Sequence, residues 1–444
     1  MNNLRPTILI IVGITGDLST RKLLPALAEI SKNEKLPDQF RIVGVTRQSN
    51  FNKGKLCKNE EDEKILKDKI DIFEMDLNEI KDYLSLKKFL FEIGEKYNLD
   101  NPQYLFYLSV PPLASSKIIE LIGKSGLASD NSKLLLEKPF GVDYDSASLM
   151  LSHIDKYFDE DKVYRIDHYL AKETVQNLLV FREGNSLFKK TWNKDFINSI
   201  EINVSESIGI EGRANFYEQT GALRDLIQSH LLGLLSLTLI NLDKNYSISD
   251  IGELRFKALK KVKVLKDKNK IVSVRGQYEG YKEEVNNDNS NVETFASISL
   301  SSSDKNWKGV SIKLSTGKAL KEKYTEIRIL YKKVRDHESN ELLFRLEPNE
   351  GISFSLLTKK PGYDHDVASH TLEFNFKNHY ESLPKAYEQV IYSAILGDHK
   401  FFTSGKEVLE TWRIVGQVKK NWEDLGDKDL VIYKKGSEIE EIIN

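Results

Sequence analysis

Short apolar runs alternate with helix-like segments through the first third of the chain. Residues 7–12 form a continuous apolar run, which is typical of a parallel strand covered on both faces. Leu23, Leu24, Leu27 and Ile30 then recur at helical spacing. This alternation predicts a doubly wound parallel sheet. Further strands are expected at 41–45, 104–108, 133–136 and 163–166, with helices around 84–97, 114–124 and 145–157.

After about residue 167 the pattern changes. Residues 199–205 alternate like a half-exposed strand, and residues 222–240 form one long helical segment. From about 250 to 360 an alternation of period two dominates, which predicts a large antiparallel sheet. The alternating runs lie at 271–277, 294–301, 308–316, 324–332 and 352–357.

The last part of the chain is expected to cover this sheet. Two helical segments, 385–396 and 406–422, should pack on it, and the polar stretch 283–291 should be a mobile loop. The predicted fold is an N-terminal Rossmann-like doubly wound α/β domain, followed by an α+β domain with a large, mainly antiparallel sheet. The corresponding domain ranges are 1–167 and 168–444.

A turn with two glycines lies between the first expected strand and the first expected helix. Its sequence is Gly13-Ile-Thr-Gly-Asp-Leu-Ser19, and small residues there let backbone N–H groups approach a pyrophosphate at a helix start. The spacing differs from the commoner G-x-G-x-x-G, so a turn without a ligand is the alternative. The residues expected to contact a dinucleotide are Gly13, Thr15, Gly16, Asp17 and Leu18.

The end of the second expected strand indicates which dinucleotide is bound. NAD sites usually have an acidic residue there, which bonds the ribose hydroxyls. Here the segment is Gly44-Val-Thr-Arg47-Gln48 and contains no acid. The guanidinium of Arg47 can form charge-assisted hydrogen bonds with a 2′-phosphate, whereas a carboxylate would repel it. This predicts NADP as the cofactor, against the alternative of an ordinary solvated arginine.

Composition and charge narrow the partners and the compartment. The 444 residues carry a net charge of −2 and no long basic run, so neither nucleic acid nor an anionic membrane is an expected partner. The longest apolar stretch, residues 231–242, is too short to cross a bilayer. Cys57 is the one cysteine, which rules out an internal disulfide and suits a reducing cytosol. We therefore expect a cytoplasmic protein.

Three motifs suit hydride-transfer chemistry. Glu137-Lys-Pro-Phe-Gly141 and Arg165-Ile-Asp-His-Tyr-Leu-Ala-Lys-Glu173 each follow an expected strand, and Gly221-Ala-Leu-Arg-Asp-Leu-Ile-Gln-Ser-His230 lies on the long helical segment. With the segment 13–22, these motifs resemble the glucose-6-phosphate dehydrogenase family. Oxidation of a sugar C1–OH, which the resemblance implies, needs a base for the hydroxyl proton, a role that suits histidine near neutral pH. Further likeness at 206–213, 317–320, 348–350 and 412–414 extends the resemblance over nearly the whole chain.

The resemblance implies a role for each motif. It implies that His230 is the catalytic base and that Asp167 is its orienting carboxylate. It places the substrate phosphate on His168, Tyr169 and Lys172, where a helix N-terminus is expected to add backbone donors. The remaining implied contacts are sugar hydroxyls at Glu206 and Asp225, substrate and nicotinamide at Lys138, and further basic contacts with substrate at Lys318 and Lys323.

Each of these residues also has an alternative, purely structural interpretation. A lone histidine in a helix is usually structural, Asp225 could simply pair with Arg224, and the lysines could be solvated surface residues. The Asp-His-Tyr segment could be a hydrogen-bonded helix start. The joint occurrence of the motifs in family order favours the functional interpretation.

Three positions depart from the family pattern. Ala171 stands where Gly is usual, Ser229 where Asn is usual, and Glu347 where some members have Gln. Loss of the amide at Ser229 is expected to alter the orientation of His230. The carboxylate of Glu347 is expected to weaken the binding of an anionic substrate. Because the chain is shorter than typical members, the resemblance is not extended to the second, structural NADP site of some relatives.

The implied activity is the oxidation of glucose 6-phosphate to 6-phospho-glucono-1,5-lactone with hydride transfer to NADP, the first step of the oxidative pentose phosphate pathway. No metal is expected, because His230 supplies the base. The alternatives are a dehydrogenase of unphosphorylated glucose, an NAD-preferring variant, and a catalytically silent sugar-phosphate or NADP sensor. Family members pair through the large sheet, so a homodimer or a dimer of dimers is expected.

Overall fold

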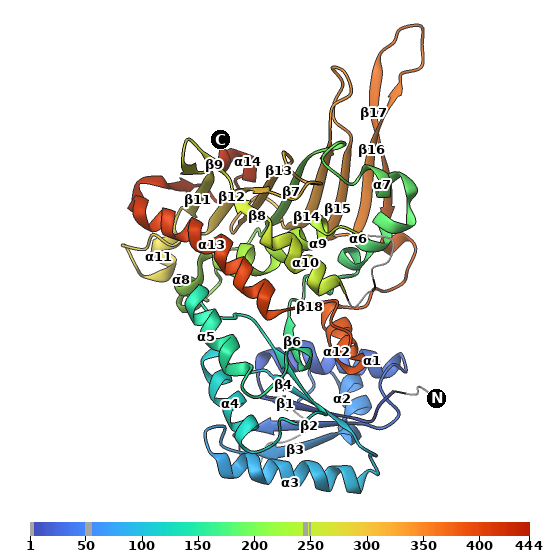
Figure 1. The fold of residues 1–444 in the computed structure, drawn as a ribbon, viewed down its shortest axis with the longest axis vertical. Coiled ribbons are helices and arrows are strands. Elements are labelled where there is room, and N and C mark those ends of the chain that lie inside the picture. The colour runs from blue at the N-terminus through green and yellow to red at the C-terminus, as the bar shows by residue number, and fades with distance from the viewer. Residues whose placement is uncertain (1–3, 49–55, 243–246, 248–249) are drawn as a thin grey trace. The chain divides into compact units, whose positions relative to one another are not determined.

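The computed structural model describes residues 4–48, 56–242, 247 and 250–444, and the chain divides into two compact units (Figure 1). The first unit comprises Met1–Ala171, Ser247–Gly252 and Pro384–Gly405. The second comprises Lys172–Tyr246, Glu253–Leu383 and Lys406–Asn444. The chain thus passes from the first unit to the second four residues later than expected, and a segment from near the C-terminus returns to the first unit.

The first unit contains a seven-stranded sheet in the order β18-β6-β5-β4-β1-β2-β3. Strands β1 to β6 are parallel, and β18 pairs antiparallel with β6. Because β1 and β4 are neighbours, the strand order reverses at this point, as in the predicted doubly wound fold. The strands are β1 (Thr7–Val12), β2 (Phe40–Thr46), β3 (Ile70–Glu74), β4 (Gln103–Leu108), β5 (Ser132–Leu136), β6 (Val163–Ile166) and β18 (Phe402–Thr403).

Helices connect these strands and cover the sheet. A π-helical segment, η1, continues directly into α1 after the glycine turn, and α12 comes from the returning segment near the C-terminus. The helical segments are η1 (Ser19–Leu23), α1 (Leu24–Lys32), α2 (Glu60–Leu66), η3 (Lys67–Lys69), α3 (Ile80–Lys96), α4 (Pro112–Lys124), α5 (Tyr144–Ile154), η4 (Glu160–Lys162) and α12 (Ala386–Leu396).

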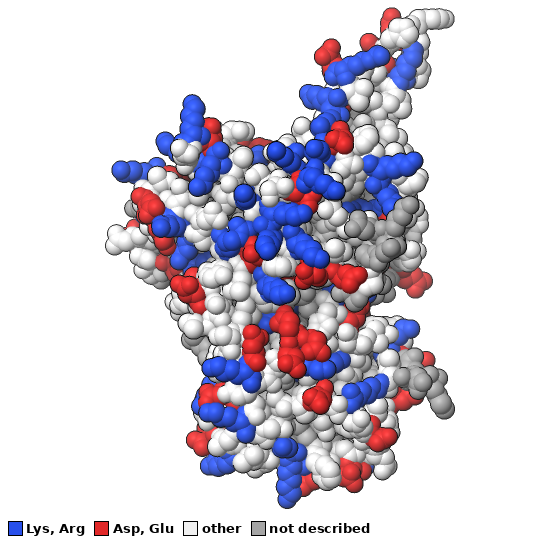
Figure 2. Space-filling model, in the orientation of Figure 1, with Lys and Arg blue, Asp and Glu red and all other residues white. Residues whose placement is uncertain are grey.

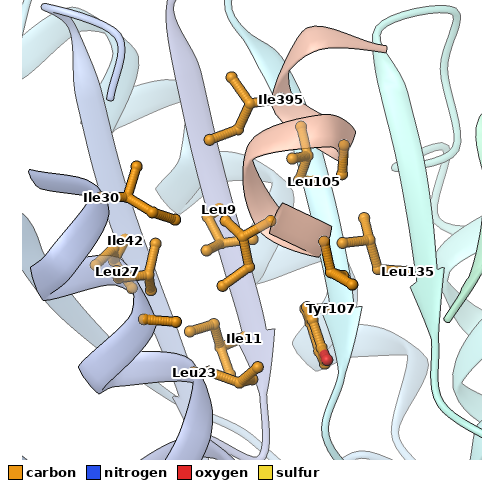
Figure 3. Packing of buried hydrophobic residues seen from close by; sticks show 14 of the residues in the cluster. Leu9, Ile11, Leu23, Leu27, Ile30, Ile42, Leu105, Tyr107, Leu135 and Ile395 are labelled. Atoms are coloured by element: carbon orange, nitrogen blue, oxygen red, sulfur yellow. The ribbon is translucent and has the colours of Figure 1, made fainter. Parts of the chain in front are cut away.

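The expectation that residues 385–396 cover the antiparallel sheet is wrong. Helix α12 packs in the first unit, where Ile395 lies beside Leu9 and Leu105 of the parallel sheet (Figure 3). The end of α12 is also held by polar contacts. Gln103 donates from Nε2 to the Ile395 carbonyl at 2.9 Å, and Lys133 donates from Nζ to the Ala394 carbonyl at 2.7 Å. The apolar stripe of α12 is compatible with either sheet, so only these contacts decide its place.

The second unit contains a ten-stranded sheet in the order β17-β16-β15-β14-β7-β13-β12-β11-β19, with β8 paired to β12. Its pairs are antiparallel except for β13 with β7 and β11 with β19. The strands are β7 (Ile197–Ser205), β8 (Val262–Val264), β11 (Ser273–Tyr278), β12 (Phe295–Ser302), β13 (Ser311–Gly317), β14 (Tyr324–Tyr331), β15 (Glu341–Glu347), β16 (Gly351–Lys359), β17 (Val367–Asn375) and β19 (Leu430–Tyr433), with a separate hairpin of β9 (Lys266–Asp267) and β10 (Lys270–Ile271).

The expected long helix at 222–240 is present as two joined segments. Residues 223–231 form a π-helix, η5, which continues into α9 and packs against β7, β12 and β13. The other helical segments are α6 (Glu173–Gly184), α7 (Ser186–Thr191), α8 (Ala214–Ala222), α9 (Leu232–Leu239), α10 (Ile251–Lys260), α11 (Tyr281–Val285), η7 (Phe376–Asn378), α13 (Gly405–Leu425), η8 (Gly426–Asp429) and α14 (Ile439–Ile443).

The stretch expected to be a mobile loop, residues 283–291, is instead tied to α8. The carboxylate of Glu218 accepts hydrogen bonds from the Tyr281 hydroxyl and the Ser290 hydroxyl, each at 2.7 Å, and from the Asn287 amide at 2.8 Å. This polar stretch is therefore held in place because one carboxylate satisfies two of its donors and the hydroxyl of Tyr281 just before it.

The surface of the second unit carries a cluster of lysine side chains. Figure 2 shows lysine side chains gathered over α10 and β8, where Lys257, Lys260, Lys261 and Lys263 are exposed. Two of these are paired, Lys257 with Glu253 at 3.7 Å and Lys261 with Asp304 at 2.7 Å, so the cluster is partly neutralised. Within the described part of the chain, no helix is both long and apolar enough to cross a membrane.

Candidate active site

The glycine turn lies at the carboxyl ends of β1 and β4, where the strand order reverses. Gly13 has a φ of +89°, and a Cβ atom there would lie within 3.0 Å of the Ser109 carbonyl oxygen, so the position requires glycine. Ser19 fixes the turn, because its hydroxyl donates to the Gly13 carbonyl at 3.0 Å and to the Ser109 hydroxyl at 2.9 Å. This position at the switch point is where doubly wound sheets bind dinucleotides.

The other predicted residues of the turn have mixed surroundings. Thr15 is half-buried, and Asp17 is exposed and forms an ion pair with Arg21 at 3.3 Å. Leu18 packs against the apolar core of the first unit. The turn therefore offers backbone groups and a helix start to an anion, while the Leu18 side chain anchors it to the sheet.

Arg47 is exposed just beyond the end of β2, which lies beside β1. Gly44 on β2 makes room for the residue that follows Gly13, because a Cβ atom at position 44 would lie within 3.0 Å of the Ile14 side chain. Arg41, on the same strand, is instead held inside by Asp71 at 2.5 Å and by the Tyr97 hydroxyl at 2.8 Å. Of these two arginines, Arg47 is the exposed one. The cradle at Gly13 and the exposed guanidinium of Arg47 fit NADP.

A half-buried carboxylate to which the sequence analysis assigned no role lies just after β5. Glu137 accepts hydrogen bonds from the hydroxyls of Tyr107 and Tyr387. Burial raises the pKa of Glu137, and the nearby carboxylate of Asp167 raises it further, although both tyrosine hydrogen bonds oppose this. Glu137, Tyr107 and Tyr387 thus form a hydrogen-bonded group close to Asp167. The motif contained Glu137, but nothing in the sequence linked it to Tyr387, 250 residues later.

The Asp-His-Tyr segment follows β6 and gathers around the same tyrosine. Asp167 is buried and accepts the backbone N–H of Tyr169 at 2.9 Å. The ring of His168 is stacked on that of Tyr387, with centroids 6.0 Å apart, and lies 5.0 Å from the ring of Tyr169. Lys138 lies next to Glu137 in the chain, before a cis proline bond. The first unit thus brings together the predicted residues Lys138, Asp167, His168 and Tyr169.

In the second unit, the ends of four neighbouring strands carry the predicted charged residues. Ser205 at the end of β7 is in register with Gly317 of β13 and with Tyr324 of β14, and Thr325 of β14 is in register with Glu347 of β15. Glu206 follows Ser205, Lys318 follows Gly317 and Lys323 precedes Tyr324. Because neighbouring strands lie about 4.8 Å apart, these residues are close together. The residues at this edge are Glu206, Lys318, Lys323 and Glu347.

Two of the predicted substrate contacts pair with each other. Lys318 forms an ion pair with Glu206, and its ammonium lies 5.2 Å from the centre of the buried Tyr217 ring. Burial raises the pKa of the Tyr217 hydroxyl, and the carboxylates of Asp225 and Glu206 add to that effect. The Lys318 ammonium and the carboxylates of Asp225 and Glu206 thus lie near Tyr217, a residue that no sequence motif indicated.

Lys172 and Lys323 are not free ammonium groups, because both contact Glu347. Lys172 donates to one carboxylate oxygen, and Lys323 lies 3.3 Å from the other. Although burial opposes it, the two lysines hold the pKa of Glu347 below its usual value. The expected backbone donors of the α6 N-terminus are also engaged, because Thr174 donates its N–H at 3.2 Å and its hydroxyl at 2.7 Å to Glu350.

His230 is buried near the end of η5, on the segment that packs against β7 and β13. The turn into this segment requires glycine at Gly221, where φ is +64° and a Cβ atom would lie within 3.0 Å of Glu293. Glu293 in turn accepts the N–H of Leu223 at 3.0 Å. Ser229, at the departure from the family pattern, donates to the Asp225 carbonyl of its own helix at 3.2 Å. His230 therefore lies on a helical segment that packs against two of the strands whose ends carry the charged residues.

The sheet order, the glycine cradle at the switch point and the exposed Arg47 define a Rossmann-type dinucleotide-binding enzyme. Matches to protein-family models show which family of enzymes this is. Residues 10–177 match the NAD binding domain of glucose-6-phosphate dehydrogenase, and residues 179–441 match its C-terminal domain. The chain belongs to the glucose-6-phosphate dehydrogenase family, a family of oxidoreductases.

Relatives support the same assignment over nearly the full length. Glucose-6-phosphate 1-dehydrogenase of Chlamydia muridarum is 35% identical over 466 aligned residues, which cover 94% of this chain and 90% of the relative. The enzyme of Borreliella burgdorferi is 35% identical, with 97% and 94% covered. A solved structure of glucose-6-phosphate dehydrogenase in complex with its substrate glucose-6-phosphate superposes with a TM-score of 0.90 at 30% identity, covering 98% of this chain and 96% of that one.

Proposed function

We propose that this chain oxidises glucose 6-phosphate at C1 to 6-phospho-glucono-1,5-lactone, with NADP as the hydride acceptor. The observation that carries the proposal is the sheet edge of the second unit, where Lys172, Lys323, Lys318 and Glu206 lie at neighbouring strand ends or beside them. The helix that carries His230 packs on two of those strands. Cations for a phosphate, carboxylates for sugar hydroxyls and an imidazole base are the groups that this reaction needs.

In the proposed mechanism, His230 accepts the proton of the C1 hydroxyl on an imidazole nitrogen as the C1–O double bond forms. Asp167 stabilises the resulting imidazolium and keeps the ring in the productive tautomer. Bound NADP supplies the hydride acceptor. Glu206 and Asp225 accept hydrogen bonds from sugar hydroxyls, and Lys138 orients the substrate towards the nicotinamide.

The substrate phosphate is assigned to Lys172 and Lys323, with His168 and Tyr169 completing the cradle. The phosphate is remote from C1, so its binding energy can hold C1 in line with the base and the cofactor. The donors assigned to it are side chains, because Thr174 of the α6 N-terminus is engaged by Glu350.

One observation favours a second substrate. Glu347 neutralises part of the charge of Lys172 and Lys323, which would favour an unphosphorylated sugar more than two unpaired lysines would. An absorbance assay at 340 nm that crosses glucose and glucose 6-phosphate with NAD and NADP tests both candidates. The main proposal requires the fastest NADPH formation with glucose 6-phosphate. If glucose were oxidised as efficiently as glucose 6-phosphate, the unphosphorylated sugar would become the proposed substrate. If no pair gave turnover, the remaining candidate would be a sugar-phosphate or NADP sensor.

We further propose that the chain forms a homodimer through β17, with a dimer of two such dimers as the alternative. Among the described strands, β17 pairs only with β16, and its residues are exposed along nearly the whole strand. Beside it, apolar side chains of β16, β17, α6 and α7 line a groove that includes Val180, Leu187, Leu356, Leu372 and Phe374. An unpaired edge next to an apolar groove fits a second copy of the same edge. Light scattering should give a dimer, and Leu372→Glu should give a monomer.

We also propose a cytoplasmic location. The single cysteine, Cys57, requires no oxidising compartment. Cell fractionation tests this, and recovery of the chain with membranes would contradict it.

A further inference from the structure

The structure places the carboxylate of Glu347 against both lysines of the assigned phosphate site. Its two oxygens contact different ammonium groups, those of Lys172 and Lys323. The contact joins residues far apart in the chain, since Lys172 precedes α6 and Glu347 ends β15. The carboxylate thus occupies the donors that a phosphate would use.

We propose that Glu347 is an internal competitor of the substrate phosphate, which lowers the affinity of the site for every small anion. The inference rests on the proposed function. A carboxylate that bridges two ammonium groups offers the same charge-assisted hydrogen bonds as two phosphate oxygens. A phosphate must therefore displace Glu347 from at least one lysine, and it still experiences the repulsion of the displaced charge.

The surroundings of the three side chains allow such an exchange. The side chain of Lys172 is 10% exposed, whereas Glu347 is 37% exposed and Lys323 is 65% exposed. Lys172 is thus fixed by burial, while Glu347 and Lys323 can move towards solvent. The nearby carboxylate of Glu350 does not compete in the same way, because it is engaged by Thr174 at the start of α6.

The competition acts on free inorganic phosphate as well as on the substrate. In the absence of substrate, Glu347 keeps the lysines partly neutralised, so a weakly held anion such as free inorganic phosphate gains little by entering. Glucose 6-phosphate gains additional contacts from its sugar hydroxyls and can complete the exchange. Glu347 therefore limits inhibition by free phosphate and also raises the KM for glucose 6-phosphate.

The test compares the wild-type chain with Glu347→Gln. Gln keeps the size of the side chain and removes its charge. We expect KM for glucose 6-phosphate and the inhibition constant of inorganic phosphate each to fall roughly 3- to 30-fold, with kcat nearly unchanged and KM for glucose unaffected. A readout without turnover is the increase in Tm caused by inorganic phosphate, which should be larger for the variant.

The matched control is Glu341→Gln. Glu341 begins the same strand, has a similar side-chain exposure of 33%, and lies 3.5 Å from Arg328, away from both lysines. It removes the same charge from the chain and should change neither constant. If Glu347→Gln left both constants unchanged, or raised KM as loss of a direct substrate contact would, the inference would be wrong. Failure of the proposed function is distinct from this, because it would appear as absent activity in the wild-type chain.

Discussion

Lys318, just after β13, and Glu206, just after β7, form an ion pair in which the cation is buried and the anion is partly open to solvent. The side chain of Lys318 is 3% exposed and that of Glu206 is 25% exposed. The two residues are held together by the parallel register of their strands. Replacing Glu206 and replacing Lys318 should therefore change the stability of the fold by different amounts.

We expect Glu206→Gln to destabilise the fold more than Lys318→Met does. Glu206→Gln leaves a buried ammonium without its counter-charge, which should lower the free energy of unfolding by about 1–3 kcal/mol. Lys318→Met leaves a carboxylate that water can reach. Urea unfolding of both single variants and of the double variant measures the coupling. Equal losses for the two single variants would contradict this asymmetry.

We expect His230→Ala to lower kcat by roughly 10²- to 10⁴-fold, because a positioned general base contributes about that much. The affinity for NADP should barely change, since the glycine turn is untouched. Asp167→Asn should lower kcat in the same direction and also spare the cofactor. The control is His153→Ala on α5, whose ring contacts Tyr157. Near-normal turnover of His230→Ala would remove His230 from the mechanism.

We expect Arg47→Ala to weaken NADP much more than NAD. A charge-assisted hydrogen bond contributes about 1.5–3 kcal/mol, which corresponds to roughly a 10- to 150-fold loss. Because Arg47 is exposed beyond the strand, the fold should be unaffected. Binding constants for the two cofactors measure the preference, with the exposed Arg335→Ala as the control. The same loss for NADP and NAD would mean that Arg47 has no role in recognising the 2′-phosphate.

We expect Lys172→Ala to reduce kcat/KM for glucose 6-phosphate far more than for glucose. Only the first substrate has a phosphate for the lysine to bind, so the comparison of two enzymes with two substrates isolates that contact. Lys189→Ala, at an exposed position on α7, serves as the control. An equal reduction for both sugars would show that Lys172 supports the fold and does not bind the phosphate.

We expect Gly13→Ala to abolish tight NADP binding and to destabilise the first unit. The new Cβ atom would meet the Ser109 carbonyl, and a positive φ costs a non-glycine residue about 1–2 kcal/mol. The control is Gly416→Ala on α13, which has open space around it and should stabilise the helix by up to about 1 kcal/mol. Thermal unfolding and NADP titration check both changes. If Gly13→Ala bound NADP with wild-type affinity, the proposed contact between the glycine turn and NADP would be wrong.

The sequence by itself determined much of the first unit. The apolar runs at 7–12, 41–45, 104–108, 133–136 and 163–166 all fall within strands, because a strand buried on both faces must be apolar throughout. Among the described strands of five or more residues, β3, β15 and β17 were not predicted. β17 lacks the apolar alternation of a half-buried strand, since it is exposed along most of its length.

The tertiary structure decided which distant residues meet. The periodicity of residues 385–396 shows an apolar stripe but not which sheet it covers, so α12 was assigned to the wrong sheet. Likewise, Glu137 with Tyr387 and Lys172 with Glu347 are pairs of polar groups whose contacts depend on the path of the whole chain. Local spacing specifies helices, strands and turns, because those depend on neighbouring residues. A counter-ion 175 residues away leaves no local pattern, so only the folded sheet shows that Glu347 occupies the lysines.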